Sequence, residues 1–429
     1  MSIKTFNLAD GAEGVFIQNN RFKTTLVSFN FYLPLARQTV APFALLPFML
    51  TSCSKKYPDF SRLNYKLAKL YGARLDASAE KFGDYQLLKM TVSLINDKYS
   101  LDDESLLKRA CDLLLGLVFE PNVENNAFFE EDLEREKRKA IEHIRGEFSE
   151  KRIYAKKQLI KAMYKDDVYG LPKCGNEEDV NAITCESLYS AWEKMLKSAY
   201  IRVQVVGSAL PQGLFEDIAD KFKSLSRNNV TNCKLTVPTK PADTVQNITE
   251  EMSVKQGKLV MGFSSEMYGD DDKTLPLMVM TDIFGGGPYS RLFSNVREKM
   301  SLCYYCSASP TRIKGLVTVD SGVEAENAQK AKEEILNQLE IIKKGEFSDF
   351  EFESSVKSIC DSFKTYSDSL TALDLWYTLK ANNEVIYTPE ELAQKVLSVT
   401  KEDVIKAANG IKLHTVYKLM PKSDTLEGK

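Results

Sequence analysis

The chain has 429 residues, more than one ordinary hydrophobic core holds, so its length predicts two or more domains. A hydrophobic content of 43% with 27% charged residues is typical of a globular protein and excludes a disordered one. The formal net charge of −3 excludes a general attraction for nucleic acid, so we expect no nucleic-acid partner.

The N-terminus and the cysteines bear on location. Residues 1–14 lack the apolar core of a signal peptide, and no apolar run reaches the length of a membrane span. We therefore expect no transmembrane segment. Eight cysteines scattered along a chain without a secretory signal are most simply reduced thiols. Together these features predict a cytoplasmic protein.

Hydrophobic periodicity predicts the elements of the first half in chain order. They are a strand at 24–35, an apolar helix at 41–53, two strands within 70–95, a helix at 104–118, a longer charged helix at 133–164, a helix at 184–196 and a strand at 201–209. Thr184 stands where the N-cap of the last helix belongs.

The second half repeats this order, which indicates an internal duplication. Its elements are a strand at 258–268, an apolar helix at 274–286, two strands within 300–323, a helix at 328–342, a longer charged helix at 350–382, a helix at 400–410 begun by Thr400, and a strand at 413–421. Residues 226–247 are polar, contain prolines and indicate a linker. The sequence thus predicts an α+β protein of two homologous tandem domains, residues 1–225 and 248–429.

Residues 285–308, GGGPYSRLFSNVREKMSLCYYCSA, contain a glycine-rich turn and a Cys-x-x-Cys. No lysine follows the glycines as a phosphate loop requires, so we interpret them as a turn in which glycine accepts positive φ. Cys303 and Cys306 fall at the start of a predicted strand, where residues three apart point to opposite faces. This placement favours a structural role for both thiols over a redox or zinc site.

The repeat and the passage 290–305 resemble the M16 (pitrilysin or insulinase-like) metallopeptidase family, whose second domain carries the motif SRLF-x-x-(L/V)-RE-x-x-GLAY. The resemblance covers nearly the whole chain. It implies that each domain is a mainly antiparallel sheet with helices packed on one face. It also implies that Arg297 and Tyr304 bind a peptide substrate. Otherwise Arg297 would form a solvated ion pair and Tyr304 would pack in a core.

Active members of that family carry the zinc box H-x-x-E-H on the apolar helix of the first domain. On that pattern Ala44, Pro47 and Phe48 replace the first histidine, the glutamate and the second histidine. The chain has only 2 histidines, His143 and His414, in different halves and without a neighbour at zinc-ligand spacing. We therefore expect no catalytic residue, no bound metal and no cofactor of its own.

The resemblance implies a non-catalytic subunit that pairs with an active M16 homologue bearing H-x-x-E-H, forms a peptide-processing chamber with it and helps bind the peptide. Zinc is then expected only in the partner. More narrowly, the chain is similar to inactive Firmicutes M16-like proteins labelled as associated with aminopentanol modification of elongation factor P. Two alternatives remain open, a homodimeric peptide-binding protein and a structural scaffold without a proteolytic role.

Overall fold

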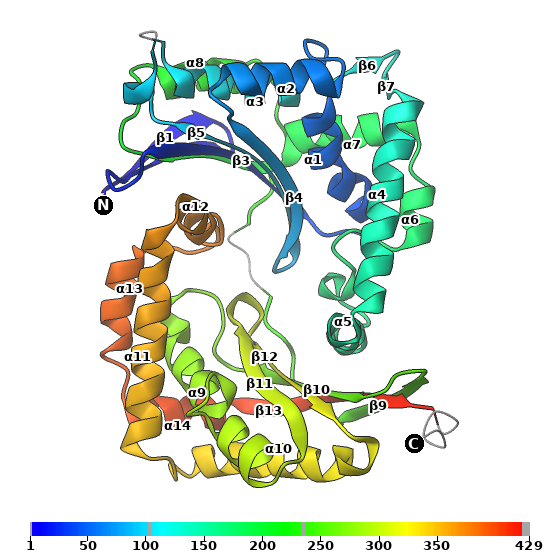
Figure 1. Cartoon of the computed structure of the whole chain (residues 1–429), viewed down its shortest axis with the longest axis vertical. Coiled ribbons are helices and arrows are strands. Elements are labelled where there is room, and N and C mark those ends of the chain that lie inside the picture. Colours follow the sequence, from blue (N-terminus) through cyan, green and yellow to red (C-terminus); the bar gives the residue numbers. More distant parts are fainter. Residues whose placement is uncertain (1, 102–103, 234–236, 423–429) are drawn as a thin grey trace. The chain divides into compact units, whose positions relative to one another are not determined.

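The computed structural model describes residues 2–101, 104–233 and 237–422. These residues form two compact units, each built on one mainly antiparallel sheet (Figure 1). Unit 1 takes its described residues from the ranges 1–145, 171–235 and 367–381. Unit 2 takes its described residues from 146–170, 236–366 and 382–429. The predicted α+β architecture is confirmed.

The sheet of unit 1 has the strand order β1-β2-β8-β3-β5-β4, and its described pairs are antiparallel except β2 with β8. The strands are β1 (Ser2–Ala9), β2 (Ala12–Gln18), β3 (Thr24–Pro34), β4 (Arg74–Phe82), β5 (Tyr85–Ile95) and β8 (Tyr200–Gly207). The helices are α1 (Val40–Ser52), α2 (Phe60–Lys69), α3 (Leu106–Phe119), most of α4 (Glu130–Ser149), α6 (Glu177–Asn181), α7 (Cys185–Ser198), α8 (Leu214–Lys223) and α12 (Leu370–Thr378). A two-stranded ribbon, β6 (Val123–Glu124) and β7 (Ala127–Phe128), precedes α4.

The sheet of unit 2 has the order β11-β12-β10-β13-β9, with β13 and β9 parallel. The strands are β9 (Gln246–Met252), β10 (Gly257–Ser265), β11 (Cys303–Thr311), β12 (Leu316–Val323) and β13 (Ile411–Pro421). The helices are α5 (Lys151–Met163), α9 (Leu275–Gly285), the π-helix η4 (Leu292–Lys299), α10 (Ala328–Lys343), α11 (Asp349–Thr365), α13 (Pro389–Val396) and α14 (Lys401–Asn409). Among the helices of the described ranges, none is long and apolar enough to cross a membrane.

The core of unit 1 lies between its sheet and a layer of helices that includes α1, α3, α7 and α8. Alternate residues of β3, including Phe29 and Phe31, are fully buried in one apolar cluster with Phe43 and Leu46 of α1. α1 carries apolar residues on all its faces because it is enclosed by β4, β5 and α7. The run at 41–53 therefore folds as the predicted buried helix.

Close packing explains the glycines that end α9. A Cβ on Gly285 would lie 2.5 Å from the backbone nitrogen of Ala308 in β11, and one on Gly286 would collide with Asp282 Oδ2. Neither glycine has a positive φ. The chain does turn after α9 as predicted, but the prediction that these glycines adopt a positive φ is wrong. They are required because neighbouring atoms leave no room for a side chain.

Both long charged helices predicted from the sequence are broken in the structure. The expected helix at 133–164 is divided into α4 and α5 at Glu150, which is extended and caps α5 by accepting a hydrogen bond from the Arg152 backbone nitrogen. The expected helix at 350–382 is divided into α11 and α12, and the extended Ser369 caps α12. Each break lets the chain change direction after a capped helix start. Both predictions of one continuous helix are wrong.

In each broken pair, the second helix, α5 or α12, belongs to the unit that is built mainly from the other half of the chain. α5 belongs to unit 2 although it lies within residues 1–225, and α12 belongs to unit 1 although it lies within residues 248–429. The structural units are thus not the contiguous stretches expected from the repeat. They differ from those stretches by the reciprocal exchange of one helix.

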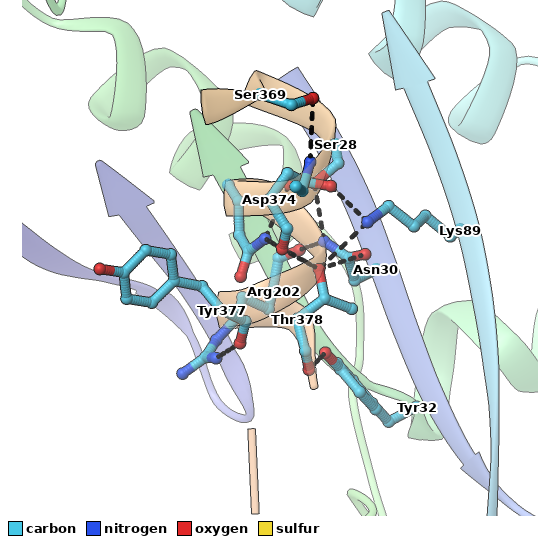
Figure 2. A network of polar contacts seen from close by, with 11 residues as sticks. Ser28, Asn30, Tyr32, Lys89, Arg202, Ser369, Asp374, Tyr377 and Thr378 are labelled. Carbon is cyan, nitrogen blue, oxygen red and sulfur yellow. Dashed lines mark hydrogen bonds and ion pairs between the residues drawn. The ribbon is translucent and has the colours of Figure 1, made fainter. Parts of the chain in front are cut away.

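α12 packs on β3 and β8 through buried polar groups (Figure 2). The Asp374 carboxylate pairs with Lys89 and accepts hydrogen bonds from Ser28 Oγ at 2.5 Å and Gln204 Nε2 at 2.8 Å. Asp374 is fully buried and the Lys89 side chain is 12% exposed. A buried carboxylate is tolerated only with such partners.

The C-terminal end of α12 is held in the same manner. The carbonyl of Thr378 accepts a hydrogen bond from Tyr32 Oη at 2.7 Å, and the carbonyl of Tyr377 accepts one from Arg202 at 2.8 Å (Figure 2). The final carbonyls of a helix lack intrahelical partners, so these side chains supply them. Ser28, Asn30 and Tyr32 alternate with the core residues of β3, which places α12 on the sheet face opposite α1.

α5 packs on β10 and β13 mainly through apolar groups. Leu159 and Met163 belong to a buried cluster with Val260 and Leu419. A Cβ on Gly262 would collide with the sulfur of Met163, so the helix sits directly on the strand backbone at that point. Ion pairs then border the apolar contact at one end of α5.

Candidate functional site

The helix that corresponds to the zinc box is α1. Ala44 and Pro47 are buried, and Phe48 is 39% exposed. None of these side chains offers a lone pair to zinc or a base to a water molecule, so the residues present do not fit the metal. Among the described residues no group of three or more histidine, cysteine, aspartate or glutamate side chains could hold a metal ion.

The two histidines lie in different units. His143 is exposed on α4. His414 is 8% exposed on β13, where its Nδ1 lies 2.8 Å from Thr415 Oγ1, and burial lowers its pKa.

Arg297 lies in the last turn of the π-helix η4 in unit 2. Its side chain is 41% exposed, its Nε lies 3.5 Å from Glu298, and its guanidinium carbon lies 4.6 Å from the centre of the Phe293 ring. A weak pair between neighbouring residues and one aromatic contact leave much of the guanidinium open. It could donate forked hydrogen bonds to a carbonyl or carboxylate of a bound chain.

Tyr304 lies at the start of β11 and is 59% exposed, so it does not pack in a core. Its hydroxyl donates a hydrogen bond to Glu324 Oε1 at 2.6 Å, and this bond raises the pKa of Tyr304. The phenol therefore stays protonated at neutral pH and available as a donor or an acceptor.

A β-bulge sets the position of Tyr304. Cys303 pairs with Val323 of β12, and Tyr305 pairs with the very next residue, Gly322, so Tyr304 is the extra residue. Just before the strand, Ser301 has a positive φ of 50°. This irregular backbone between η4 and β11 joins Arg297 to Tyr304, and neither the bulge nor the π-helix had a recognisable signal in the sequence.

The bulge also corrects the prediction for the cysteines. Cys303 pairs with Val323 and Cys306 with Ser321. Val323 and Ser321 are two residues apart on β12 and share a face, so their partners also share a face. The prediction that the two thiols point to opposite faces is wrong, because the extra residue shifts the alternation by one.

The fold, the degenerate helix α1 and the passage from η4 to β11 define an M16-like protein without the zinc box. A model of the family described as "Peptidase M16 inactive domain" matches residues 182–359. Over 409 residues, 95% of each chain, the sequence is 31% identical to the "Probable inactive metalloprotease YmfF" of Bacillus subtilis. The chain belongs to the M16 peptidase family and is a non-catalytic member of it.

Other proteins share the sequence or the fold of this chain at lower identity. It is 23% identical to the "Uncharacterized zinc protease YmxG" of Bacillus subtilis, over 70% of this chain and 71% of that one. A conserved protein from Enterococcus faecalis V583 has a similar structure, with a TM-score of 0.90 and 25% identity over 98% of this chain and 99% of that one. The peptidase M16 inactive domain from Pseudomonas fluorescens shares the fold, with a TM-score of 0.78 and 17% identity over 98% of this chain and 99% of that one.

Proposed function

We propose that this chain is the non-catalytic subunit of a cytoplasmic heterodimer whose other subunit is an active, zinc-bearing M16 homologue. In this proposal Arg297 and Tyr304 hold the peptide while the partner supplies zinc and the H-x-x-E-H residues. The observation that carries it is a contrast within the chain. The zinc-box positions hold alanine, proline and phenylalanine, whereas the peptide-binding positions still present an exposed guanidinium and an exposed phenol.

A second observation supports the pairing. The relatives include one protein named an inactive metalloprotease and one named a zinc protease, both from Bacillus subtilis strain 168. An organism with both kinds of chain has the components of a mixed pair. A subunit that orients the substrate lowers the barrier of the reaction without chemistry of its own.

The first test is assembly. Native mass spectrometry of the chain purified from its own host, with zinc analysis of the same sample, should give a one-to-one complex with a chain bearing H-x-x-E-H and about one zinc per pair. A metal-free homodimer without such a partner would overturn the proposal and favour a homodimeric peptide-binding protein or a scaffold.

The second test addresses the two residues. Arg297→Ala and Tyr304→Phe should each lower the pair's kcat/KM for peptide by about tenfold, the loss of roughly one good hydrogen bond, with assembly unchanged. Arg74→Ala and Tyr65→Phe are matched controls, because both side chains are well exposed in unit 1. Equal kinetics in all four variants would remove Arg297 and Tyr304 from the proposal.

A further inference from the structure

The Cys303–Cys306 pair has features that the proposed function does not use. Both residues are reduced thiols with exposures of 9% and 6%. The bulge makes them consecutive residues on one face of β11, although they are three apart in sequence. Their partners on β12, Val323 and Ser321, are themselves next neighbours on one face, so no side chain of β11 lies between the two thiols on that face.

The surroundings of the two thiols make them chemically unequal. A hydrogen bond from the Cys306 thiol, the Ser321 side chain and the positive charge of Arg297 together lower the pKa of Cys303 despite its burial. The same hydrogen bond and burial raise the pKa of Cys306 well above its usual range. Cys303 is therefore the better nucleophile, and Cys306 is held next to it as a protonated thiol.

Other cysteines of the chain have a raised pKa, whereas that of Cys303 is lowered. Burial raises the pKa of Cys53 to about 11, and it also raises the pKa values of Cys111, Cys185 and Cys360. A thiol of lowered pKa next to a second thiol, rather than a lone buried thiol, is the arrangement of a peroxide-sensitive pair.

We propose that Cys303 and Cys306 form a thiol-oxidation site that takes small hydroperoxides and closes to an intrachain disulfide. The Cys303 sulfur attacks one oxygen of the hydroperoxide, the O–O bond breaks, and the thiol proton passes to the leaving oxygen, giving a sulfenic acid and water or an alcohol. The Cys306 sulfur then attacks the Cys303 sulfur, and its proton leaves with the sulfenic hydroxyl as one water while the S–S bond forms. Two thiols are oxidised and one peroxide bond is reduced. A small oxidant is specified because both sulfurs are mostly covered.

The disulfide would restrict the backbone conformation of the bulge that contains Tyr304. A bond between Cys303 and Cys306 closes a ring that contains Tyr304 and Tyr305, so the bulge can no longer relax independently of β11. The presentation of the Tyr304 hydroxyl to Glu324 or to a peptide then depends on the redox state. This consequence, unlike the thiol chemistry itself, rests on the proposed function.

Peptide mass mapping of the isolated chain tests the chemistry. After hydrogen peroxide treatment, with dimedone present to trap sulfenic acids, the wild type should show a Cys303–Cys306 linkage and little dimedone adduct. Cys306→Ser has no second thiol and should carry dimedone at Cys303. Cys303→Ser should leave Cys306 unmodified. Loss of free Cys303 should be at least about tenfold faster than loss of Cys53 or Cys360.

The control variant is Cys360→Ser, since the Cys360 thiol is buried and donates to the Ala393 carbonyl at 3.2 Å. It should leave the Cys303–Cys306 linkage unchanged. The proposal is overturned if both thiols remain open to alkylation in denaturant after peroxide, or if Cys303 reacts no faster than Cys53. Because neither peptide nor partner is present, failure here leaves the proposed function intact. Failure of the Arg297→Ala and Tyr304→Phe test likewise leaves the disulfide result intact.

Discussion

The two exchanged helices dock on their sheets by opposite means. α5 lies on β10 and β13 with Leu159 and Met163 in an apolar cluster, close enough that only glycine fits at position 262. α12 lies on β3 and β8 with a buried aspartate, Asp374, bonded to Lys89 and Gln204. An apolar contact does not depend on orientation. A buried carboxylate, in contrast, is stable only where hydrogen-bond donors and cations lie next to its oxygens. We infer that α12 is the more stringently positioned of the two helices.

This contrast predicts different sensitivities to substitution. Truncating one partner of a buried polar network leaves the others desolvated and unpaired. Truncating an apolar side chain leaves a cavity, whose cost depends on how far the neighbours relax. Four substitutions compare buried polar, buried apolar and exposed contacts, from the largest expected loss of stability to the smallest.

Asp374→Ala should lower the free energy of unfolding by about 4 kcal/mol, because Lys89 and Gln204 would remain buried without the carboxylate. Urea unfolding of the purified chain measures this. The matched control is Asp368→Ala in the same segment of unit 1, residues 367–381, whose carboxylate pairs with Arg21 at an exposure of 64% for both side chains. The control should lose less than about 1 kcal/mol. Similar losses for the two variants would contradict a buried role for Asp374.

Leu159→Ala in α5 should lower the free energy of unfolding by about 3 kcal/mol, because the fully buried side chain fills the cluster on unit 2's sheet. The same urea experiment measures it. Ile153→Ala on the same helix is the control, since Ile153 is 43% exposed and should change stability little. A loss equal to that control would mean that α5 is not held by its apolar face.

Asp320→Asn should lower the free energy of unfolding by about 2 kcal/mol at neutral pH. Asp320 is buried in unit 2 and pairs with Arg152 at 2.5 Å and Lys156 at 2.8 Å. Burial alone would raise its pKa, but these cations outweigh burial and lower it. Its stabilisation is thus fully present above the unfolded pKa of about 3.9 and disappears as the pH falls through the lower folded pKa. The stability difference between wild type and variant should shrink in acid, and parallel pH curves would contradict it.

Tyr304→Phe should change the free energy of unfolding by less than about 0.5 kcal/mol, because the residue is 59% exposed and its bond to Glu324 is at the surface. Tyr32→Phe is the contrasting variant. Tyr32 is fully buried and donates to Thr378 at the end of α12, so its loss should exceed about 1 kcal/mol. If Tyr304→Phe were the more destabilising change, Tyr304 would be a structural residue.

The sequence predicted the elements better than their connections. Thr184 and Thr400 cap their helices as expected, each with a reciprocal capping box. A cap depends on residues within four positions, so a local pattern contains it. The breaks at Glu150 and Ser369 were missed because both flanking segments are good helix formers, so the local caps were not recognised, and each new helix is then held by packing on the other half's sheet.

The candidate site also has one part that the sequence predicted and one part that it did not. The loss of the zinc box follows from the identities of Ala44, Pro47 and Phe48 alone, since no folding gives these side chains metal-binding chemistry. The relation of Cys303 to Cys306 could not be predicted, because one extra residue at Tyr304 reverses which face each later side chain takes.

The sequence by itself determined the α+β class, the repeat, the family and the missing catalytic groups, because each depends on residue identity or on short-range periodicity. Only the tertiary structure decided the exchange of α5 and α12 and the shared face of the two thiols. Both depend on pairings between residues far apart in the chain or on the register of neighbouring strands. Residue periodicity within one segment contains neither kind of information.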